Sequence, residues 1–259
     1  MTDSYPAGQH TALLSPPLPQ PNWALFLDVD GTLVDIAQSP DDVRVSPALR
    51  ADLEAVASRL DGALALISGR SIEALDRLFH PLRLPASGQH GSEWRPAARD
   101  AVLPMAATPL TENLNRIVTQ IDRLHPGILI ERKSHAVAVH YRHAPELGPV
   151  IGSLLGEAVA NVEGLMLMPG KCVWEIKDAT QSKGTAVARF LQQRTFLNRV
   201  PVFIGDDRTD EDGFQVVEQH GGQAFAVGAL ARKRLYQPGF ATPADVRQWL
   251  GEFAKGASA

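Results

Sequence analysis

Short apolar runs recur near both ends of the chain, and segments with helical periodicity separate them. The apolar runs cover residues 24–29, 63–67, 84–87, 200–204 and 224–227. The helical segments cover residues 47–60, 72–79, 182–193, 210–218 and 243–253. A run without polar alternation is typical of a strand that is covered on both faces. The order of these elements therefore predicts an α/β protein with a parallel sheet between layers of helices.

The middle of the chain follows a different pattern. A helical segment at 110–124 precedes apolar runs at 128–132 and 136–142, and a second helical segment at 146–159 precedes runs at 165–168 and 172–176. One helix and two strands, repeated twice, is typical of an antiparallel α+β unit. We therefore expect residues 108–177 to form a smaller domain inserted into a core made of residues 22–107 and 178–259. Residues 1–21 are rich in Pro, Ser and Gln, which predicts a flexible tail.

Composition narrows the class of protein. Of the 259 residues, 44% are hydrophobic, which is enough for a sizeable core. The net charge of −4 and the lack of a dense Lys/Arg cluster argue against a nucleic-acid partner. The single cysteine, Cys172, rules out an intrachain disulfide and a cysteine zinc site. Without a signal-peptide pattern or an apolar stretch of about 18 residues, we expect a cytoplasmic protein with no membrane partner.

Asp28 and Asp30 stand where the first apolar run ends. Two like charges ~4 Å apart repel by about 4 kcal/mol at an intermediate dielectric, and a divalent cation with oxygen ligands offsets this cost. Taken alone, Asp-x-Asp-Gly is also typical of an acidic turn. A calcium-binding loop would need further acidic ligands at the positions of Leu33 and Val34. Asp28 and Asp30 alone are therefore compatible with either a metal site or a turn, and other residues are needed to distinguish the two.

Polar groups follow other strands or open helices in the same predicted sheet. Ser68 follows the second strand, Lys183 opens a helix, and Asp206, Asp207 and Asp210 follow a later strand. Each has a simpler explanation, such as a turn, a solvated lysine or acids that stabilise a helix N-terminus. However, the carboxyl ends of parallel strands meet at one edge of a sheet. A hydroxyl, an ammonium group and several carboxylates together favour a site for phosphoryl transfer.

These groups resemble the four motifs of the haloacid dehalogenase superfamily of phosphatases, the first being Asp28-Val29-Asp30-Gly31-Thr32. Further runs at 67–70, 88–91, 170–177 and 205–212 resemble the bacterial trehalose-6-phosphate phosphatase family. The similarity extends from about residue 23 to residue 249. It implies a Rossmann-like parallel-sheet core with an inserted α+β cap domain, and a monomeric enzyme that releases phosphate from a small sugar phosphate.

The resemblance also implies a mechanism. Asp28 would attack phosphorus and form an aspartyl-phosphate. Asp30 would protonate the leaving sugar oxygen and later deprotonate the attacking water. Ser68 and Lys183 would hold the transferred phosphoryl group.

A magnesium ion is the cofactor that the resemblance implies. The Asp28 carboxylate, the Asp30 backbone carbonyl and Asp206 would hold Mg²⁺, with Asp207 and Asp210 in supporting positions behind these ligands. An inserted cap would exclude water from the aspartyl-phosphate when it closes.

Recognition of the sugar is expected from the cap and from loops at the edge of the core. The implied substrate-binding residues are Gly69, Arg70, Gln89, His90, Glu131, Lys133, His140, Arg142, Lys171 and Glu175. Glu131 and Lys133 would equally suit a solvated sheet face, and Arg70 would equally suit a salt bridge. A zinc site formed by His135, His140 and His143 is disfavoured because these residues do not share one strand face.

Two other functions fit parts of the pattern. A related phosphatase or phosphomutase would act on another sugar phosphate, such as sucrose phosphate or mannosyl-3-phosphoglycerate. A sugar-phosphate sensor without activity would usually lack the nucleophile, whereas every expected catalytic position is filled here. The sequence therefore favours an enzyme that acts on trehalose 6-phosphate.

Overall fold

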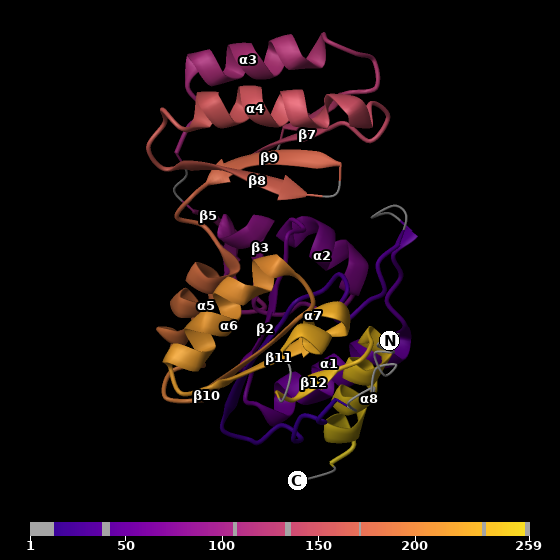
Figure 1. Ribbon diagram of the computed structural model, residues 1–259. Helices are drawn as coiled ribbons and strands as arrows, with labels where there is room; N and C mark the ends of the chain where they lie inside the picture. The colour runs from indigo at the N-terminus through magenta and orange to yellow at the C-terminus, as the bar shows by residue number, and fades with distance from the viewer. Residues whose placement is uncertain are drawn as a thin grey trace, which may run out of the picture.

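The protein consists of two stacked bodies, each built on its own sheet (Figure 1). A computed structural model describes residues 13–37, 42–105, 108–132, 136–170, 172–234 and 237–256. The larger body contains an eight-stranded sheet and the smaller one a four-stranded sheet. Each body has a separate cluster of buried apolar side chains. We refer to them as the core and the cap.

The core sheet has the strand order β12-β11-β10-β1-β2-β3-β4-β5. Its strands are β1 (Trp23–Leu27), β2 (Leu64–Ile67), β3 (Ala86–Gly88), β4 (Glu93–Arg95), β5 (Leu103–Pro104), β10 (Val200–Gly205), β11 (Gln223–Val227) and β12 (Gly239–Phe240). The strands from β12 to β3 are parallel, and β4 and β5 continue the sheet antiparallel. The predicted α/β fold with a mostly parallel sheet is therefore confirmed. The strands β4, β5 and β12 were not predicted from the sequence, and they have only two or three residues each.

Helices cover the core sheet on both faces. They are α1 (Pro47–Arg59), α2 (Ile72–Phe79), α5 (Lys183–Leu191), α6 (Glu211–Gln219), α7 (Gly228–Lys233) and α8 (Pro243–Ala254). In Figure 1, α1 lies beside α8 and α5 lies beside α6, on opposite sides of the strands. Ser46 and Thr242 cap α1 and α8, and a proline opens each helix.

The cap sheet has the strand order β6-β7-β9-β8 and is antiparallel throughout. Its strands are β6 (Leu129–Arg132), β7 (Ala136–His140), β8 (Leu165–Gly170) and β9 (Val173–Asp178). The helices α3 (Glu112–Asp122) and α4 (Gly148–Val159) cover one face, where Val137, Val139 and Ile176 are buried. The other face looks toward the core (Figure 1). Because side chains alternate along a strand, this open face carries Glu131 and Glu175 on either side of Ala138.

Two chain segments join the cap to the core, and Asp178 ties them together. Its Oδ2 accepts a hydrogen bond from the Thr108 backbone N–H at 2.6 Å. Its Oδ1 accepts from the Thr180 backbone N–H at 2.8 Å. The division of the chain at residues 108 and 178 remains our proposal, and the separate apolar clusters of the two bodies support it.

Residues 13–21 lie against the core. The Leu14 carbonyl accepts a hydrogen bond from Gly239 N at 3.0 Å, and the Pro17 carbonyl accepts one from Trp249 Nε1, also at 3.0 Å. The described part of the predicted tail therefore contacts β12 and α8. None of the helices in the described ranges is long and apolar enough to cross a membrane.

Candidate active site

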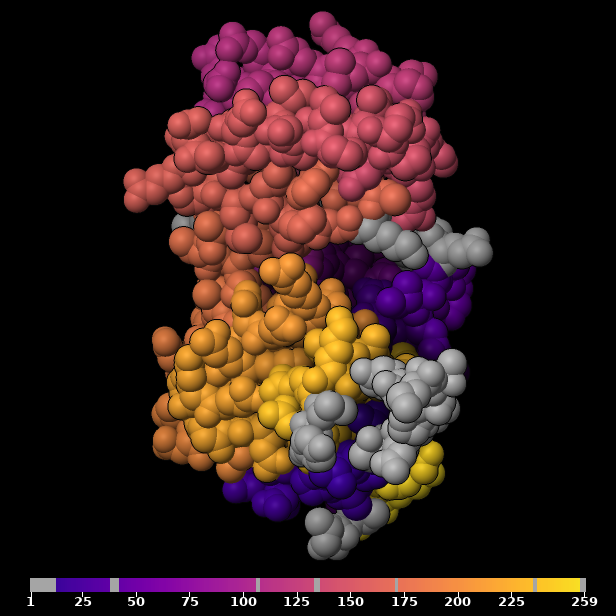
Figure 2. Space-filling model, in the orientation of Figure 1, coloured from indigo at the N-terminus to yellow at the C-terminus, as the bar shows by residue number. Residues whose placement is uncertain are grey.

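A cleft of about 820 Å³ separates the cap from the carboxyl ends of the core strands. Figure 2 shows the hollow between the two bodies. Side chains from the core and from the cap both line it. The lining includes the following residues that the sequence assigned to catalysis or binding: Asp28, Asp30, Ser68, Gly69, Arg70, Gln89, His90, Glu131, Arg142, Lys183 and Asp207.

Lys183 and Asp28 form a buried ion pair on the floor of this cleft. The Lys183 Nζ lies 2.7 Å from Asp28 Oδ1 and 2.6 Å from Asp210 Oδ1. The side chains of Asp28 and Lys183 are about one-twentieth exposed. Burial alone would lower the pKa of Lys183, but Asp28 and Asp210 raise it above its usual value. Lys183 is therefore a fixed ammonium group beside the proposed nucleophile.

Asp206 approaches Asp28 from the neighbouring strand β10. The Asp28 N–H donates to the Ile204 carbonyl at 3.0 Å, which aligns the two strand ends. The Asp206 carboxylate lies against the backbone of Gly31. Only glycine leaves room for it there, because a Cβ atom at position 31 would lie 2.1 Å from Asp206 Oδ2. Burial, together with Asp28 and Asp207, raises the pKa of Asp206 to about 7. Burial also raises the pKa of Asp28, against the opposing effect of Lys183.

Asp210 braces the loop that carries Asp206 and Asp207. Its Oδ2 accepts hydrogen bonds from the backbone N–H groups of Asp206 at 3.0 Å and Asp207 at 3.1 Å. Its Oδ1 is bonded to Lys183, so both oxygens have partners. This bracing carboxyl is fully buried, and burial raises its pKa. Asp210 therefore fixes the position of this loop relative to Lys183, and its supporting role at the metal site stays a prediction.

Asp207 caps the short helical turn that follows it. It accepts hydrogen bonds from Thr209 N at 2.8 Å and from Thr209 Oγ1 at 2.7 Å. Although partial burial opposes ionisation, Lys183 and the bonds from Thr209 lower the pKa of Asp207. It lies 3.9 Å from Lys183, farther than Asp28 and Asp210 do.

The acidic cluster suits a hard cation. Carboxylate oxygens of Asp28, Asp206 and Asp210 lie within 4.8 Å of one another. Such oxygens are the ligands that Mg²⁺ prefers. Since both oxygens of Asp210 already have partners, Asp28 and Asp206 are the carboxylates better placed to take an ion.

Asp30 forms a bidentate ion pair with the guanidinium group of Arg70. Arg70 Nε donates to Asp30 Oδ2 at 2.6 Å, and Nη2 donates to Oδ1 at 2.7 Å. From the sequence, Arg70 would suit either substrate binding or a salt bridge. The structure shows the salt bridge, and Arg70 also lines the cleft. The loop that carries Arg70 is further fixed by Ser68 Oγ, which accepts from Arg70 N at 3.1 Å.

A family model described as trehalose-phosphatase matches residues 26–234. The chain belongs to the trehalose-phosphatase family. It is 40% identical over 232 residues to the trehalose-6-phosphate phosphatase of Escherichia coli, covering 88% of this chain and 85% of that protein. It is 43% identical over 209 residues to a probable trehalose-phosphate phosphatase of Sinorhizobium fredii, covering 80% of this chain and 78% of that protein.

Solved structures of proteins named trehalose-6-phosphate phosphatase have the same fold as this chain. The C-terminal domain of trehalose-6-phosphate phosphatase from C. albicans aligns with a TM-score of 0.75 at 24% identity, covering 95% of this chain and 99% of that one. A trehalose-6-phosphate phosphatase structure from Aspergillus fumigatus aligns with a TM-score of 0.64 at 28% identity, covering 90% of this chain and 93% of that one. The two-body architecture is therefore shared with solved trehalose-phosphatase structures.

The cap residues that the sequence predicts to bind the sugar divide into three groups. Glu131 and Arg142 line the cleft, as does Arg132, which the sequence analysis did not select. His140 and Glu175 are absent from the lining; His140 Nε2 lies 3.0 Å from Glu131 Oε2, and Glu175 is buried on the open face of the cap sheet. Lys133 and Lys171 lie outside the described residues. The sugar-binding roles of all these residues remain predictions.

Proposed function

We propose that this protein hydrolyses trehalose 6-phosphate to trehalose and phosphate through an aspartyl-phosphate on Asp28. The single observation that carries the mechanism is the buried pair of Asp28 and Lys183, with Asp206 beside it, at the base of a polar cleft. Membership of the trehalose-phosphatase family supports the choice of substrate, and the named relatives do not favour another sugar phosphate.

Asp28 is the nucleophile in this scheme. One oxygen of its carboxylate attacks phosphorus, the bond between phosphorus and the sugar oxygen breaks, and Asp30 supplies the proton that the leaving oxygen takes up. Water then attacks the aspartyl-phosphate while Asp30 removes its proton, and inorganic phosphate leaves. Lys183 and the Ser68 hydroxyl hold the phosphoryl oxygens. Mg²⁺, held by Asp28, Asp206 and the Asp30 carbonyl, would neutralise charge on the phosphoryl group.

The contact between Arg70 and Asp30 bears on this scheme. Both Asp30 oxygens accept hydrogen bonds from the guanidinium group. One of these bonds must break, and the released Asp30 oxygen must take up a proton, before Asp30 can protonate the leaving sugar oxygen. Binding of the phosphate gives Arg70 a second anionic partner, which favours that release.

The cap would select the sugar. Glu131 and Arg142 reach the cleft, and Glu175 lies on the same sheet face as Glu131. Charged groups on a rigid sheet suit a ligand that offers many hydroxyl groups.

We also propose that the protein is a monomer and is located in the cytoplasm, as expected from the sequence.

The decisive experiment measures phosphate release from trehalose 6-phosphate, with Mg²⁺ and after its removal by a chelator. We expect turnover only with Mg²⁺, and a clear preference over glucose 6-phosphate and sucrose phosphate. Asp28→Asn should abolish turnover while the circular-dichroism spectrum stays that of the wild type. Cleavage of glucose 6-phosphate as efficiently as trehalose 6-phosphate would refute the assignment.

A further inference from the structure

Lys177 is a buried lysine where the cap joins the core. It lies on β9, two residues after Glu175, so both side chains are on the open face of the cap sheet, which looks toward the core. Lys177 is only 8% exposed, and its Nζ donates a hydrogen bond to the Gln181 backbone carbonyl at 2.9 Å. A lysine is seldom buried to this extent, because its ammonium group loses its contact with water. This contact therefore calls for an explanation.

Gln181 stands directly before the start of α5. Ser182 caps this helix, since its Oγ accepts a hydrogen bond from Thr185 N at 3.2 Å and its N–H donates to Thr185 Oγ1 at 2.9 Å. Lys183 is the first residue of the helix. The bond from Lys177 therefore attaches the last strand of the cap to the chain two residues before the catalytic lysine.

A loop of the core packs tightly against the same turn of α5. A Cβ atom at Gly91 would lie 2.7 Å from the Ser182 carbonyl oxygen and 3.1 Å from Ser182 N, so the two backbones are in close contact. Lys177 on the cap strand and Gly91 in the core thus provide two separate contacts next to the start of α5. Together they fix where this helix begins.

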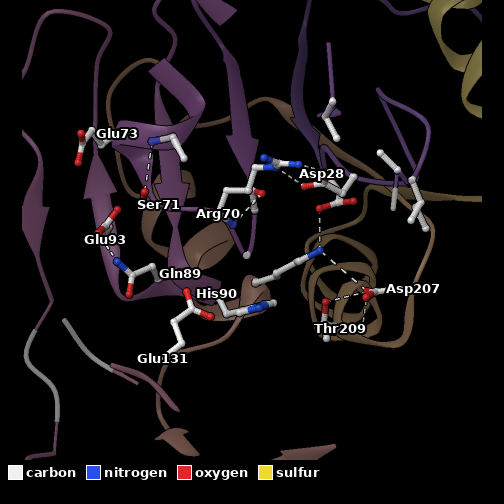
Figure 3. A pocket seen from close by; sticks show the side chains of 18 of the residues that line it. Asp28, Arg70, Ser71, Glu73, Gln89, His90, Glu93, Glu131, Asp207 and Thr209 are labelled. Carbon is white, nitrogen blue, oxygen red and sulfur yellow. Dashed lines mark hydrogen bonds and ion pairs between the residues drawn. The ribbon is translucent and has the colours of Figure 1, made fainter. Parts of the chain in front are cut away.

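The start of α5 in turn determines where the Lys183 ammonium group lies. Lys183 Nζ is 2.7 Å from Asp28 Oδ1 and 2.6 Å from Asp210 Oδ1. In Figure 3, dashed lines join this ammonium group to the labelled Asp28 and Asp207. Two bonds this short leave little room for the helix to shift without breaking one of them.

We propose that Lys177 is a positioning residue that holds the start of α5 against the cap strand β9, and so keeps Lys183 in place to bind the transferred phosphoryl group. The inference rests on the proposed function for the role of Lys183. Lys177 is not one of the predicted site residues and does not belong to the described lining of the cleft. It therefore acts through Lys183 and not on the substrate.

Lys177→Met tests this role, because methionine keeps the apolar stem but cannot donate to the Gln181 carbonyl. The variant is assayed with trehalose 6-phosphate and with p-nitrophenyl phosphate, which has no sugar. The kcat values for both substrates should fall in step, by about 10-fold, since Lys183 serves the phosphoryl group of either one. Inhibition by orthovanadate, which resembles the transferred phosphoryl group, should weaken by a similar factor.

Two further variants serve as controls. Lys177→Arg keeps a positively charged donor at the same place, so it should recover most of the lost activity and of the lost vanadate inhibition. Lys233→Met makes the same change as the test variant at an exposed position of α7, and it should leave all these values unchanged.

The outcomes separate the possible roles. A lower melting temperature with unchanged kcat and vanadate inhibition, measured where the variant is fully folded, would show that Lys177 only stabilises the turn, and would overturn the proposal. A loss confined to trehalose 6-phosphate would also overturn it, because the effect would then concern the sugar. An arginine variant as poor as the methionine variant would do the same.

The proposed function is tested separately by the wild type. Failure of the wild type to cleave trehalose 6-phosphate would refute the proposed substrate. The values for p-nitrophenyl phosphate and orthovanadate would still decide the role of Lys177, because neither compound contains a sugar.

Discussion

Asp206 has the clearest electrostatic signature among the residues of the site. It is half-buried and lies beside two other carboxylates, Asp28 and Asp207, so its charged form is costly. Burial and these neighbours raise its pKa to about 7. A divalent cation would favour the charged form instead, because a metal binds the carboxylate and competes with the proton. Metal binding and protonation at Asp206 should therefore oppose each other near neutral pH.

This opposition gives a prediction about pH and stability. In the unfolded chain, an aspartate releases its proton near its ordinary pKa, whereas folded, metal-free Asp206 keeps it up to about 7. Between these values the folded state binds more protons, so the stability of the metal-free protein should fall as pH rises through 7. Added Mg²⁺ should raise the melting temperature more at pH 8 than at pH 5.5. Calorimetry at both pH values, with and without Mg²⁺, measures these differences.

Asp206→Asn serves as the control for this measurement. The amide cannot ionise, so the melting temperature of the variant should change less across the same pH range. Mg²⁺ should also stabilise the variant less than the wild type at pH 8. Equal stabilisation of the wild type by Mg²⁺ at pH 5.5 and pH 8 would contradict the role of Asp206 as an ion ligand.

Sequence patterns could predict which chemical groups meet, but not how they pair. Asp28, Lys183 and Asp206 were expected together because each follows a strand or opens a helix at one edge of a parallel sheet. The bonds of Asp210 to two backbone N–H groups depend on the path of one loop, which periodicity does not contain. The pairing of Asp30 with Arg70 joins residues 40 positions apart and depends on side-chain rotamers.

At the scale of elements, the site depends on the turn after β1. The turn is tight, since Gly31 N donates to the Val34 carbonyl at 2.8 Å, and Gly31 adopts a φ of 87°. The parallel pairing of β1 with β10 brings Asp206 directly over this glycine. Gly31 therefore serves both the backbone conformation and the position of a carboxylate on the neighbouring strand.

Gly31→Ala separates these two roles. The left-handed backbone should cost about 1 kcal/mol in the free energy of unfolding. The new Cβ would also lie 2.1 Å from Asp206 Oδ2 and must displace it. We expect turnover to fall by about 100-fold, since a small misplacement of a reacting group is costly. Urea denaturation and the phosphatase assay measure the two effects.

Gly221→Ala is a matched control for this change. Gly221 also has a positive φ, 74°, but no described atom lies within 4 Å of its added Cβ. It should lose similar stability and keep its turnover. If both variants lost activity equally, backbone strain alone would explain the effect, and the contact with Asp206 would be irrelevant.

The elements themselves were predictable where their patterns were long. The α2 helix was expected at residues 72–79 and lies there, because its apolar residues Ile72, Leu75 and Phe79 are buried at helical spacing. The β4 strand could not be predicted from Glu93, Trp94 and Arg95, which are too few and too polar to show alternation. It forms because it pairs with β3, a contact that only the folded sheet supplies.

At the scale of the molecule, the cap depends on its linkers for its position. The apolar clusters of core and cap are separate, and the cleft between them is lined largely by polar and charged side chains. Bodies joined in this way are expected to move relative to each other. Asp178 is the link between the two connecting segments, because its carboxylate accepts hydrogen bonds from Thr108 and Thr180.

Replacing Asp178 by alanine should therefore loosen the cap without unfolding either body. The buried carboxylate is only 3% exposed, and its loss leaves the N–H groups of Thr108 and Thr180 without this acceptor. Limited proteolysis should cut the linkers faster than in the wild type, and kcat/KM for trehalose 6-phosphate should fall by about 10-fold, because the cap no longer aligns the sugar. Hydrolysis of p-nitrophenyl phosphate, which needs the core alone, should fall much less.

Asp122→Ala, at an exposed position on α3, should change none of these rates. A loss of both activities in step, with unchanged proteolysis, would mean that Asp178 supports the core and does not control the cap.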